Sequence, residues 1–355
     1  MRARRRIALA AVALLAALTT GCSAPFDPAA WTLEPIPYTP RGMKATDVSY
    51  AQAALAPDGS GGFWGVSSTT WLHVGAEAET LAHVNVAVDS PGSQPALLAP
   101  LSATELLTAD RNALTRGHSP LGVLETGDMS WREVPSVLDD DGIASITGIA
   151  ADGRDVLVGL LRPAARGTTG PLALEVVRIG LDDGSRALLH TETISVASAE
   201  QGRFAATTAT GVLSDGTVLL TTPNGLSLLA ADGSVLDRIP SDEPVPLLAI
   251  GPDDQILWWG HPAGSAGTPS HPPAAFQVRG GSAEARTSIE TASKCADGRR
   301  LQFMSAAGGL LRETARLPFL CGARAAIWTG SSWVVSIGGE GDGVLVRVTP
   351  PKKAG

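Results

Sequence analysis

The chain has 355 residues, is 44% hydrophobic and 17% charged, and carries a formal net charge of −8 at pH 7. Its length and apolar content are sufficient for a large buried core. The acidic balance argues against nucleic acid as a partner, because each phosphate contact requires a cation, and against a polybasic contact with anionic lipid. The excess of arginine over lysine, with abundant alanine and glycine, is typical of GC-rich genomes such as those of actinobacteria.

The first 22 residues have the pattern of a secretory signal. Four of the first six residues are arginine, an unbroken apolar run follows from Ile7 to Leu18, and small residues lead to Gly21 and Cys22. The run is shorter than the ~20 apolar residues that a membrane-spanning helix needs. A cysteine directly after glycine at this point resembles the end of a bacterial lipoprotein signal. The resemblance implies a signal peptide over residues 1–21, lipidation of Cys22 and anchoring at the extracytoplasmic face of the cell membrane.

The segment after Cys22 is rich in proline, with Pro25, Pro28, Pro35, Pro37 and Pro40. Proline-rich segments stay extended, at about 3.1 Å per residue. We therefore expect a semi-rigid tether over residues 22–44, up to ~60 Å long, in which Trp31 and Tyr38 are the side chains able to rest on the domain. A folded domain is expected over residues 45–350, followed by a short C-terminal tail over 351–355.

The clearest structural unit runs from Arg203 to Pro240. Four strand-like segments are separated by three turn signals, which contain Asp215-Gly216, Asn224-Gly225 and Asp232-Gly233. Such pairs favour tight hairpins, because the turn needs positive φ at its central residues. A four-stranded antiparallel meander of about 40 residues is one blade of a β-propeller.

The same pattern recurs more weakly along the chain. The other units span residues 50–88, 97–135, 143–192, 245–290, 301–320 and 325–349. Each begins with an apolar strand, a polar turn and a second apolar strand. The sequence therefore predicts an all-β chain folded as a β-propeller of six or seven four-stranded blades, and we favour seven. A barrel or sandwich is the alternative architecture.

The units resemble secreted bacterial β-propellers of the Asp-box and NHL-like kind. The nearest segment to an Asp box, whose pattern is Ser-x-Asp-x-Gly-x-Thr-Trp, is Thr126–Trp131. Ser130 and Trp131 match the end of the pattern, whereas Asp128 stands where glycine belongs and Leu124 where serine belongs. The resemblance implies the propeller fold for most of the mature chain and no particular activity.

Two cysteines remain once Cys22 is assigned to the lipid. Cys295 and Cys321 lie in an exported chain, where disulfides persist. We predict that they form a disulfide, which stabilises by roughly 3 kcal/mol in the chain-entropy model; the alternative is two separate buried thiols. No C-x-x-C or H-x-x-x-H spacing is present, so the sequence predicts neither a metal site nor a cofactor.

Three segments approach known catalytic or ligand-binding motifs without completing them. Gly117–Leu121 lacks the final glycine of a nucleophile elbow. Gly338–Gly343 is followed by a strand pattern instead of a helix and holds two carboxylates, which disfavours a phosphate site. Asp139–Gly142 has contiguous acidic residues, whereas calcium loops alternate them. We interpret all three as loops and assign no catalytic residue.

The one candidate binding edge is aromatic. Trp258 and Trp259 are neighbours in a strand pattern, so their side chains point to opposite faces and one of them is available as an aromatic surface. A long proline-rich segment follows and includes His261. Long loops on rigid scaffolds are common places for binding. We predict that Trp258, Trp259 and His261 contribute to a ligand-binding or partner-binding edge.

Together these features predict a membrane-anchored extracytoplasmic lipoprotein that acts as a binding or protein-interaction platform for an envelope protein or an extracellular ligand. The alternative is a sialidase-like, glycan-active propeller enzyme. Such an enzyme needs arginines and carboxylates that converge on the central channel. An apolar or mixed channel rim favours docking instead, so the residues around the channel distinguish the two functions.

Overall fold

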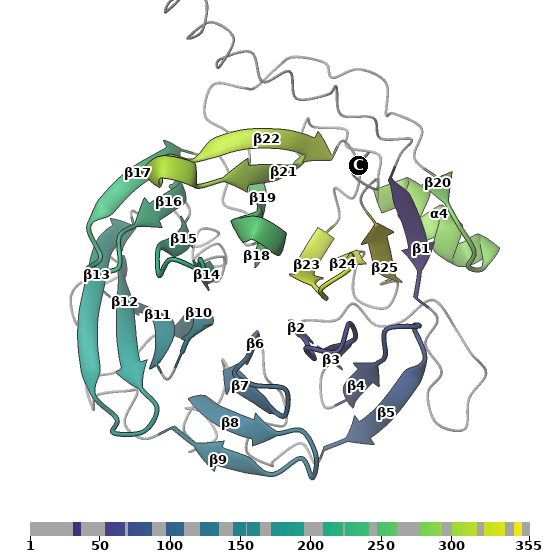
Figure 1. Ribbon diagram of the computed structural model, residues 1–355, viewed down its shortest axis with the longest axis horizontal. Helices are drawn as coiled ribbons and strands as arrows, with labels where there is room; N and C mark the ends of the chain where they lie inside the picture. The colour runs from purple at the N-terminus through teal and green to yellow at the C-terminus, as the bar shows by residue number, and fades with distance from the viewer. Residues whose placement is uncertain are drawn as a thin grey trace, which may run out of the picture.

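The computed structural model describes residues 31–36, 54–67, 70–86, 97–109, 121–134, 145–153, 155–163, 172–194, 209–222, 224–240, 247–260, 277–292, 300–317, 323–337 and 344–349. These residues form a closed ring of six antiparallel blades around a central axis, which is a β-propeller (Figure 1). The predicted fold class is confirmed.

Five blades contain four strands in sequence order from the axis outward, whereas the sixth takes its fourth strand from the start of the chain and is extended by β20. The first contains β2 (Ala54–Pro57), β3 (Phe63–Ser67), β4 (Thr70–Val74) and β5 (Thr80–Asn85). The second contains β6 (Leu97–Pro100), β7 (Glu105–Ala109), β8 (Leu121–Glu125) and β9 (Trp131–Glu133). The third contains β10 (Ser145–Asp152), β11 (Asp155–Pro163), β12 (Leu172–Gly180) and β13 (Arg186–Ile194).

The fourth blade contains β14 (Ala209–Val212), β15 (Val218–Thr222), β16 (Gly225–Leu229) and β17 (Val235–Pro240). The fifth contains β18 (Leu248–Ile250), β19 (Ile256–Gly260), β21 (Arg300–Ser305) and β22 (Arg312–Leu317). The sixth contains β23 (Ala323–Trp328), β24 (Trp333–Ile337), β25 (Val344–Thr349) and, from the start of the chain, β1 (Thr32–Pro35). The blade predicted between Arg203 and Pro240 is the fourth one.

The structure has six blades and not the seven that we favoured. The predicted units at 245–290 and 301–320 are the inner and outer halves of the fifth blade. The segment between β19 and β21 is almost as long as a blade and carries β20 (Gln277–Val278) and the helix α4 (Ala283–Ala292). This insertion made one blade look like two in the sequence.

The ring is closed by the N-terminal strand. β1 pairs antiparallel with β25, from Thr32 opposite Thr349 to Pro35 opposite Val346, and forms the outer strand of the sixth blade (Figure 1). Trp31 is 6% exposed, and its ring stacks on Phe303 with a centroid separation of 5.4 Å. Residues 31–36 of the expected tether therefore lie in the propeller, whereas Tyr38 lies outside the described residues.

The insertion in the fifth blade also reaches the sixth. β20 pairs parallel with β1, and α4 packs outside the sheet, with Ala285 and Ile289 completely buried against the core. In Figure 1 both elements lie on the outer side of β1. No helix within the described part of the chain is long and apolar enough to cross a membrane.

The hydrophobic core is divided among the six junctions between neighbouring blades, each of which holds one cluster of buried side chains. Successive residues of a strand point to opposite faces of its sheet. Because both faces of a blade are covered by neighbours, strands such as β15 and β16 are buried at every position. This explains the continuous apolar runs in the sequence.

The inner strands β2, β6, β10, β14, β18 and β23 contact one another around the axis. They run in the same direction, so their C-terminal ends meet on one face of the ring. We call this the turn face. It carries the turns after each first and third strand, described at 58–62, 75–79, 101–104, 126–130, 153, 181–185, 213–217, 230–234, 251–255, 306–311 and 329–332. β1 also begins on this face, because it runs antiparallel to β25.

Candidate functional site: the central channel

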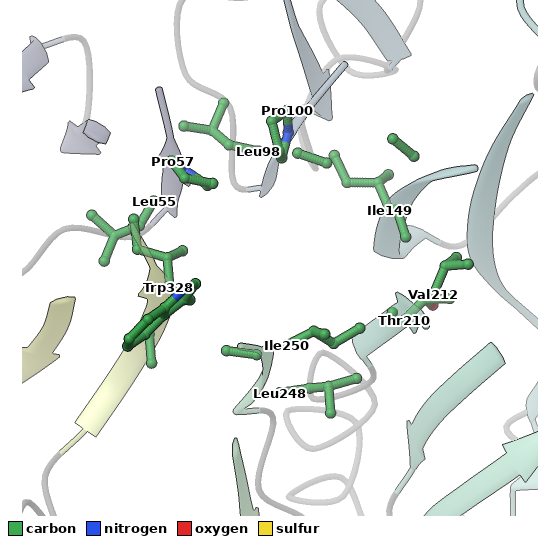
Figure 2. Close-up of a pocket in the computed structure, with 17 residues that line it drawn as sticks. Leu55, Pro57, Leu98, Pro100, Ile149, Thr210, Val212, Leu248, Ile250 and Trp328 are labelled. Atoms are coloured by element: carbon green, nitrogen blue, oxygen red, sulfur yellow. The ribbon is translucent and has the colours of Figure 1, made fainter. Parts of the chain in front are cut away.

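The six inner strands enclose a cavity of about 330 Å³ on the propeller axis. Every blade contributes side chains to its lining. Figure 2 labels Leu55, Pro57, Leu98, Pro100, Ile149, Thr210, Val212, Leu248, Ile250 and Trp328, which surround an open centre. Sites assembled from elements far apart in the sequence are fixed by the whole fold, so this cavity is preformed.

The lining is apolar. None of the described residues that line the cavity is charged, and Thr210 is the one hydroxyl among them. The hydroxyl of Thr210 is buried against the third blade, where Gly148 leaves room for it: a Cβ at Gly148 would overlap with this oxygen. The Thr210 hydroxyl therefore faces the neighbouring blade. The other described side chains offer hydrocarbon and the Trp328 ring to the cavity, and the remaining polar groups of the lining are backbone groups and the Trp328 indole N–H.

One ring of lining residues marks where the cavity opens on the turn face. Side chains on the same side of a strand recur every second residue, so each inner strand places one lining residue inside and another at its end or, in β10, one residue before its end at Asp152. The end residues, which we call the mouth ring, are Pro57, Pro100, Ala151, Val212, Ile250 and Trp328. Pro100 is exposed and the other five are half-buried. A ligand approaching from the turn face meets apolar side chains first.

Carboxylates are frequent in the turns of this face, and beside the mouth itself they lie in the turns of the first, fourth and fifth blades. The described turns of the turn face contain no lysine or arginine, and they contain Asp58, Glu77, Glu79, Asp128, Asp182, Asp183, Asp215, Asp232, Asp253 and Asp254. Asp215 follows the end of β14, and Asp253 and Asp254 follow the end of β18 in the short helix η3 (Pro252–Asp254). These three lie in the turns that directly continue two strands of the mouth ring.

Hydrogen bonds within the turns keep several of these carboxylates ionised. The side-chain hydroxyl and the backbone N–H of Thr217 hold the pKa of Asp215 below its ordinary value. The pKa of Asp128 is lowered in the same way by Ser130. Asp254 accepts hydrogen bonds from the backbone N–H and the hydroxyl of Ser214, which ties the turns of the fourth and fifth blades together.

Asp58 is the buried carboxylate of the turn face. It accepts hydrogen bonds from the backbone N–H of Ser60 (2.8 Å) and of Gly62 (2.9 Å), and it lies 2.9 Å from Nε2 of His73. Burial raises the pKa of Asp58, but the hydrogen bonds from His73, Ser60 and Gly62 outweigh it and hold the pKa below its ordinary value. The His73 ring stacks on Trp64 with a centroid separation of 4.2 Å. This cluster fixes the turn that follows Pro57 of the mouth ring.

The predicted aromatic edge is placed only in part. Trp258 is 1% exposed and packs in the core between the fourth and fifth blades, so it offers no binding surface. The side chain of Trp259 and all of His261 lie outside the described residues. The predicted lipidation of Cys22 and the disulfide between Cys295 and Cys321 also fall outside them. These remain predictions.

The channel residues were not identified from the sequence, although one signal was present. The first two inner strands both end in Leu-Ala-Pro, at 55–57 and at 98–100. In both strands the leucine and the proline line the channel. A repeated apolar end of the first strand, just before the turn, is the pattern that indicates a channel mouth once a propeller is assumed.

Fold and site together define a six-bladed β-propeller. Its ring of blades is closed by the N-terminal strand β1, and its central channel is lined by apolar side chains. No protein-family model matches the chain, and no curated protein matches it. Among solved structures, the chain is similar to a putative TolB from Agrobacterium tumefaciens, with 14% identity and a TM-score of 0.49 over 90% of this chain and 97% of that chain.

It is also similar to a putative gluconolactonase, with 8% identity and a TM-score of 0.47 over 87% of this chain and 93% of that one. A third similar structure is a gluconolactonase from Xanthomonas campestris, with 14% identity and a TM-score of 0.38 over 57% of this chain and 66% of that one. Identities and scores at this level carry nothing about what the present chain binds.

Proposed function

We propose that this protein is a membrane-anchored extracytoplasmic lipoprotein that acts as a binding platform, and that its central channel is the binding site. The observation that carries the proposal is the cavity of about 330 Å³, which all six blades line without a charged side chain. Preformed, largely apolar cavities of this size are typical binding sites for small molecules and for inserted side chains.

The apolar side chains of the lining favour binding of an apolar group of the ligand. Burial of apolar surface contributes about 25 cal/mol per Å², and the ring of Trp328 offers an aromatic face at the mouth. The strands around the cavity are fixed by the buried clusters between blades. Little conformational freedom is therefore lost on binding, which favours affinity.

The same lining argues against the glycan-active alternative. Glycoside hydrolysis requires paired carboxylates or an equivalent nucleophile and acid at the scissile bond. Among the described residues, the cavity lining offers no carboxylate, arginine or tyrosine. An apolar rim supports docking, and no described feature favours an enzymatic function over it.

Anchoring through Cys22 would hold the domain close to the membrane. The described residues begin at Trp31, directly before β1, so eight residues separate them from Cys22. At about 3.3–3.6 Å per residue, this spacer and its flanking bonds reach ~30 Å, about half the length expected for the whole tether.

Metabolic labelling with an alkyne fatty acid tests the anchor. We expect the full-length chain to be labelled and membrane-associated, and the Cys22→Ala variant to be unlabelled and released. A labelled Cys22→Ala chain would contradict the assignment of the anchor.

Binding of the uncharged dye N-phenyl-1-naphthylamine tests the site itself. The secreted form, residues 23–355 with no lipid, is titrated and dye fluorescence is recorded. Ala151→Phe fills the cavity at the mouth ring and is expected to weaken dye binding at least ~10-fold, about 1.4 kcal/mol. Leu188→Phe is the matched control, because Leu188 is 60% exposed on the outer strand β13 and far from the lining. Equal binding by wild type and Ala151→Phe, with both folded, would overturn the proposed site.

A further inference from the structure

The mouth of the channel combines two properties that a single ligand must satisfy. Its mouth ring is apolar, and the turns that continue the inner strands carry carboxylates. Asp215 lies three residues after Val212, and Asp253 lies three residues after Ile250, so both carboxylates stand just outside mouth-ring residues. Asp215 and Asp253 are exposed.

These charges are held in place by the turns. Oδ1 of Asp215 accepts the backbone N–H of Thr217 at 2.9 Å, and the same arrangement recurs at Asp232, whose Oδ1 accepts the N–H of Ser234 at 3.0 Å. These bonds fix the orientation of Asp215 and Asp232. Positive charge also reaches the turn face, because Arg347 donates to the carbonyl oxygen of Ala76 at 2.6 Å and Arg178 pairs with Asp152 at the end of β10. The exposed carboxylates beside the mouth are therefore those of the fourth and fifth blades.

We propose that the partner recognised by the channel is a basic peptide segment of another protein, which inserts an apolar side chain into the channel and places lysine or arginine on the carboxylates in the turns of the fourth and fifth blades. This inference rests on the proposed function of the channel as a binding site and names its ligand. Apolar anchors in a pocket with a charged rim are how many protein interfaces combine affinity with fast, specific association.

Charge complementarity decides between this ligand and a lipid chain. An acyl chain fits an apolar cavity equally well, but its anionic headgroup would meet the carboxylates of the turn face, and anionic membrane surfaces attract basic segments rather than acidic ones. An anionic glycan or a nucleic acid meets the same repulsion. A cationic segment with an apolar centre is the ligand that satisfies both the ring and the turns.

Three peptides of equal length test the proposal on the purified secreted form, residues 23–355. They are Lys-Lys-Leu-Phe-Leu-Lys-Lys, Glu-Glu-Leu-Phe-Leu-Glu-Glu and Lys-Lys-Ser-Gly-Ser-Lys-Lys, each with a fluorescent label. We expect the first to bind at least ~10-fold more tightly than either of the others at low salt, and its affinity to fall as salt is raised.

The double variant Asp215→Asn/Asp253→Asn removes two charges, and asparagine keeps an acceptor oxygen for the turn. The double variant is expected to lower the affinity for the peptide Lys-Lys-Leu-Phe-Leu-Lys-Lys about 2- to 10-fold and to leave the affinity for the dye unchanged. Its matched control is Glu133→Gln/Glu290→Gln, which removes two exposed charges from β9 and α4, away from the turn face. This control is expected to retain full peptide affinity.

The outcomes separate the two proposals. If the dye binds in the channel but the lysine and glutamate peptides bind equally, the basic partner is wrong and the channel remains a site for uncharged apolar ligands. If Ala151→Phe changes neither dye nor peptide binding, the channel is not the site and both proposals fail. Equal losses in the two double variants would show a general charge effect and would also overturn the basic partner.

Discussion

At the residue scale, Asp58 supports the channel mouth without lining it. Its side chain is 4% exposed and accepts hydrogen bonds from the two backbone N–H groups and the hydroxyl of the turn that follows Pro57. A buried carboxylate of this kind organises its turn, because three donors converge on it and the N–H of Gly62 would otherwise be buried without this partner. The position of Pro57 at the mouth therefore depends on Asp58.

We predict that Asp58→Ala destabilises the protein by about 1–3 kcal/mol at pH 7. The folded-state pKa of Asp58 lies below its ordinary value. Its contribution is therefore fully present above the unfolded pKa and is lost as the pH falls through the folded pKa. The difference in unfolding free energy between wild type and variant, measured by urea titration, should narrow as the pH is lowered from 6 toward 3. A difference that stays constant over this range would contradict the account.

Gly122 provides a second prediction, in the second blade. The Trp131 indole lies over its backbone, so a Cβ at Gly122 would overlap with the ring. The indole is fixed, because its Nε1 donates to Thr108 Oγ1 at 3.0 Å. We expect Gly122→Ala to lower the free energy of unfolding by about 1–3 kcal/mol, as measured by chemical denaturation.

Gly127 is the control for this substitution, because nothing lies within 4 Å of a Cβ placed there. We expect Gly127→Ala to remain within about 0.5 kcal/mol of wild type. Equal stability of the two alanine variants would show that Trp131 does not hold the position assigned to it.

At the scale of elements, the strand that closes the ring has the largest predicted effect. β1 buries Leu33 completely, and the residues that flank the strand, Trp31 and Ile36, are 6% and 2% exposed. Burial of side chains of this size is worth about 1.5–3 kcal/mol each. A chain that begins at residue 37 should therefore have a free energy of unfolding lower by roughly 5 kcal/mol or more. A chain that begins at residue 31 should have the same melting temperature as the chain of residues 23–355. Equal melting temperatures for the chains that begin at 31 and 37 would refute closure by β1.

The elements also show where sequence patterns were informative. The fourth blade could be predicted because its strands are joined by short hairpins, and its turns at Asp215-Gly216 and Asp232-Gly233 place glycine at φ of +82° and +85°. Such turns are a local signal. β1 has no local signal: it is four residues long and includes Pro35, and its partner β25 lies more than 300 residues away. Its composition therefore indicated a tether.

The candidate site was predictable only in part for a related reason. Leu248 and Ile250 look like any buried strand residues in the sequence, and only closure of the ring places them on the axis. Trp258 and Trp259 were treated as exceptional because they are large and adjacent, yet Trp258 fills a junction between blades as most apolar strand residues do. The size of a side chain therefore predicts that it is buried. Which strand residues line the channel depends on how all six blades are arranged.

At the scale of the whole molecule, the start of β1 and the mouth ring lie on the same face. β1 begins on the turn face, where the mouth ring lies. With Cys22 lipidated and eight residues between it and Trp31, Trp31 at the turn face would be held within ~30 Å of the membrane surface. A basic, apolar segment near the membrane is the partner that this arrangement favours.

The measurement that tests the central claim most directly is ¹⁹F NMR of the secreted form, residues 23–355, with 5-fluorotryptophan in place of tryptophan. Trp328 lines the mouth, whereas Trp71 and Trp258 are at most 1% exposed in the cores between blades. The Trp328 signal is assigned by its loss in Trp328→Phe. On titration with N-phenyl-1-naphthylamine we predict a saturable shift of the Trp328 signal, with the Trp71 and Trp258 signals unchanged; Trp333 is no control, because its ring contacts that of Trp328. Binding of the dye with no shift at Trp328 would contradict a binding site in the central channel.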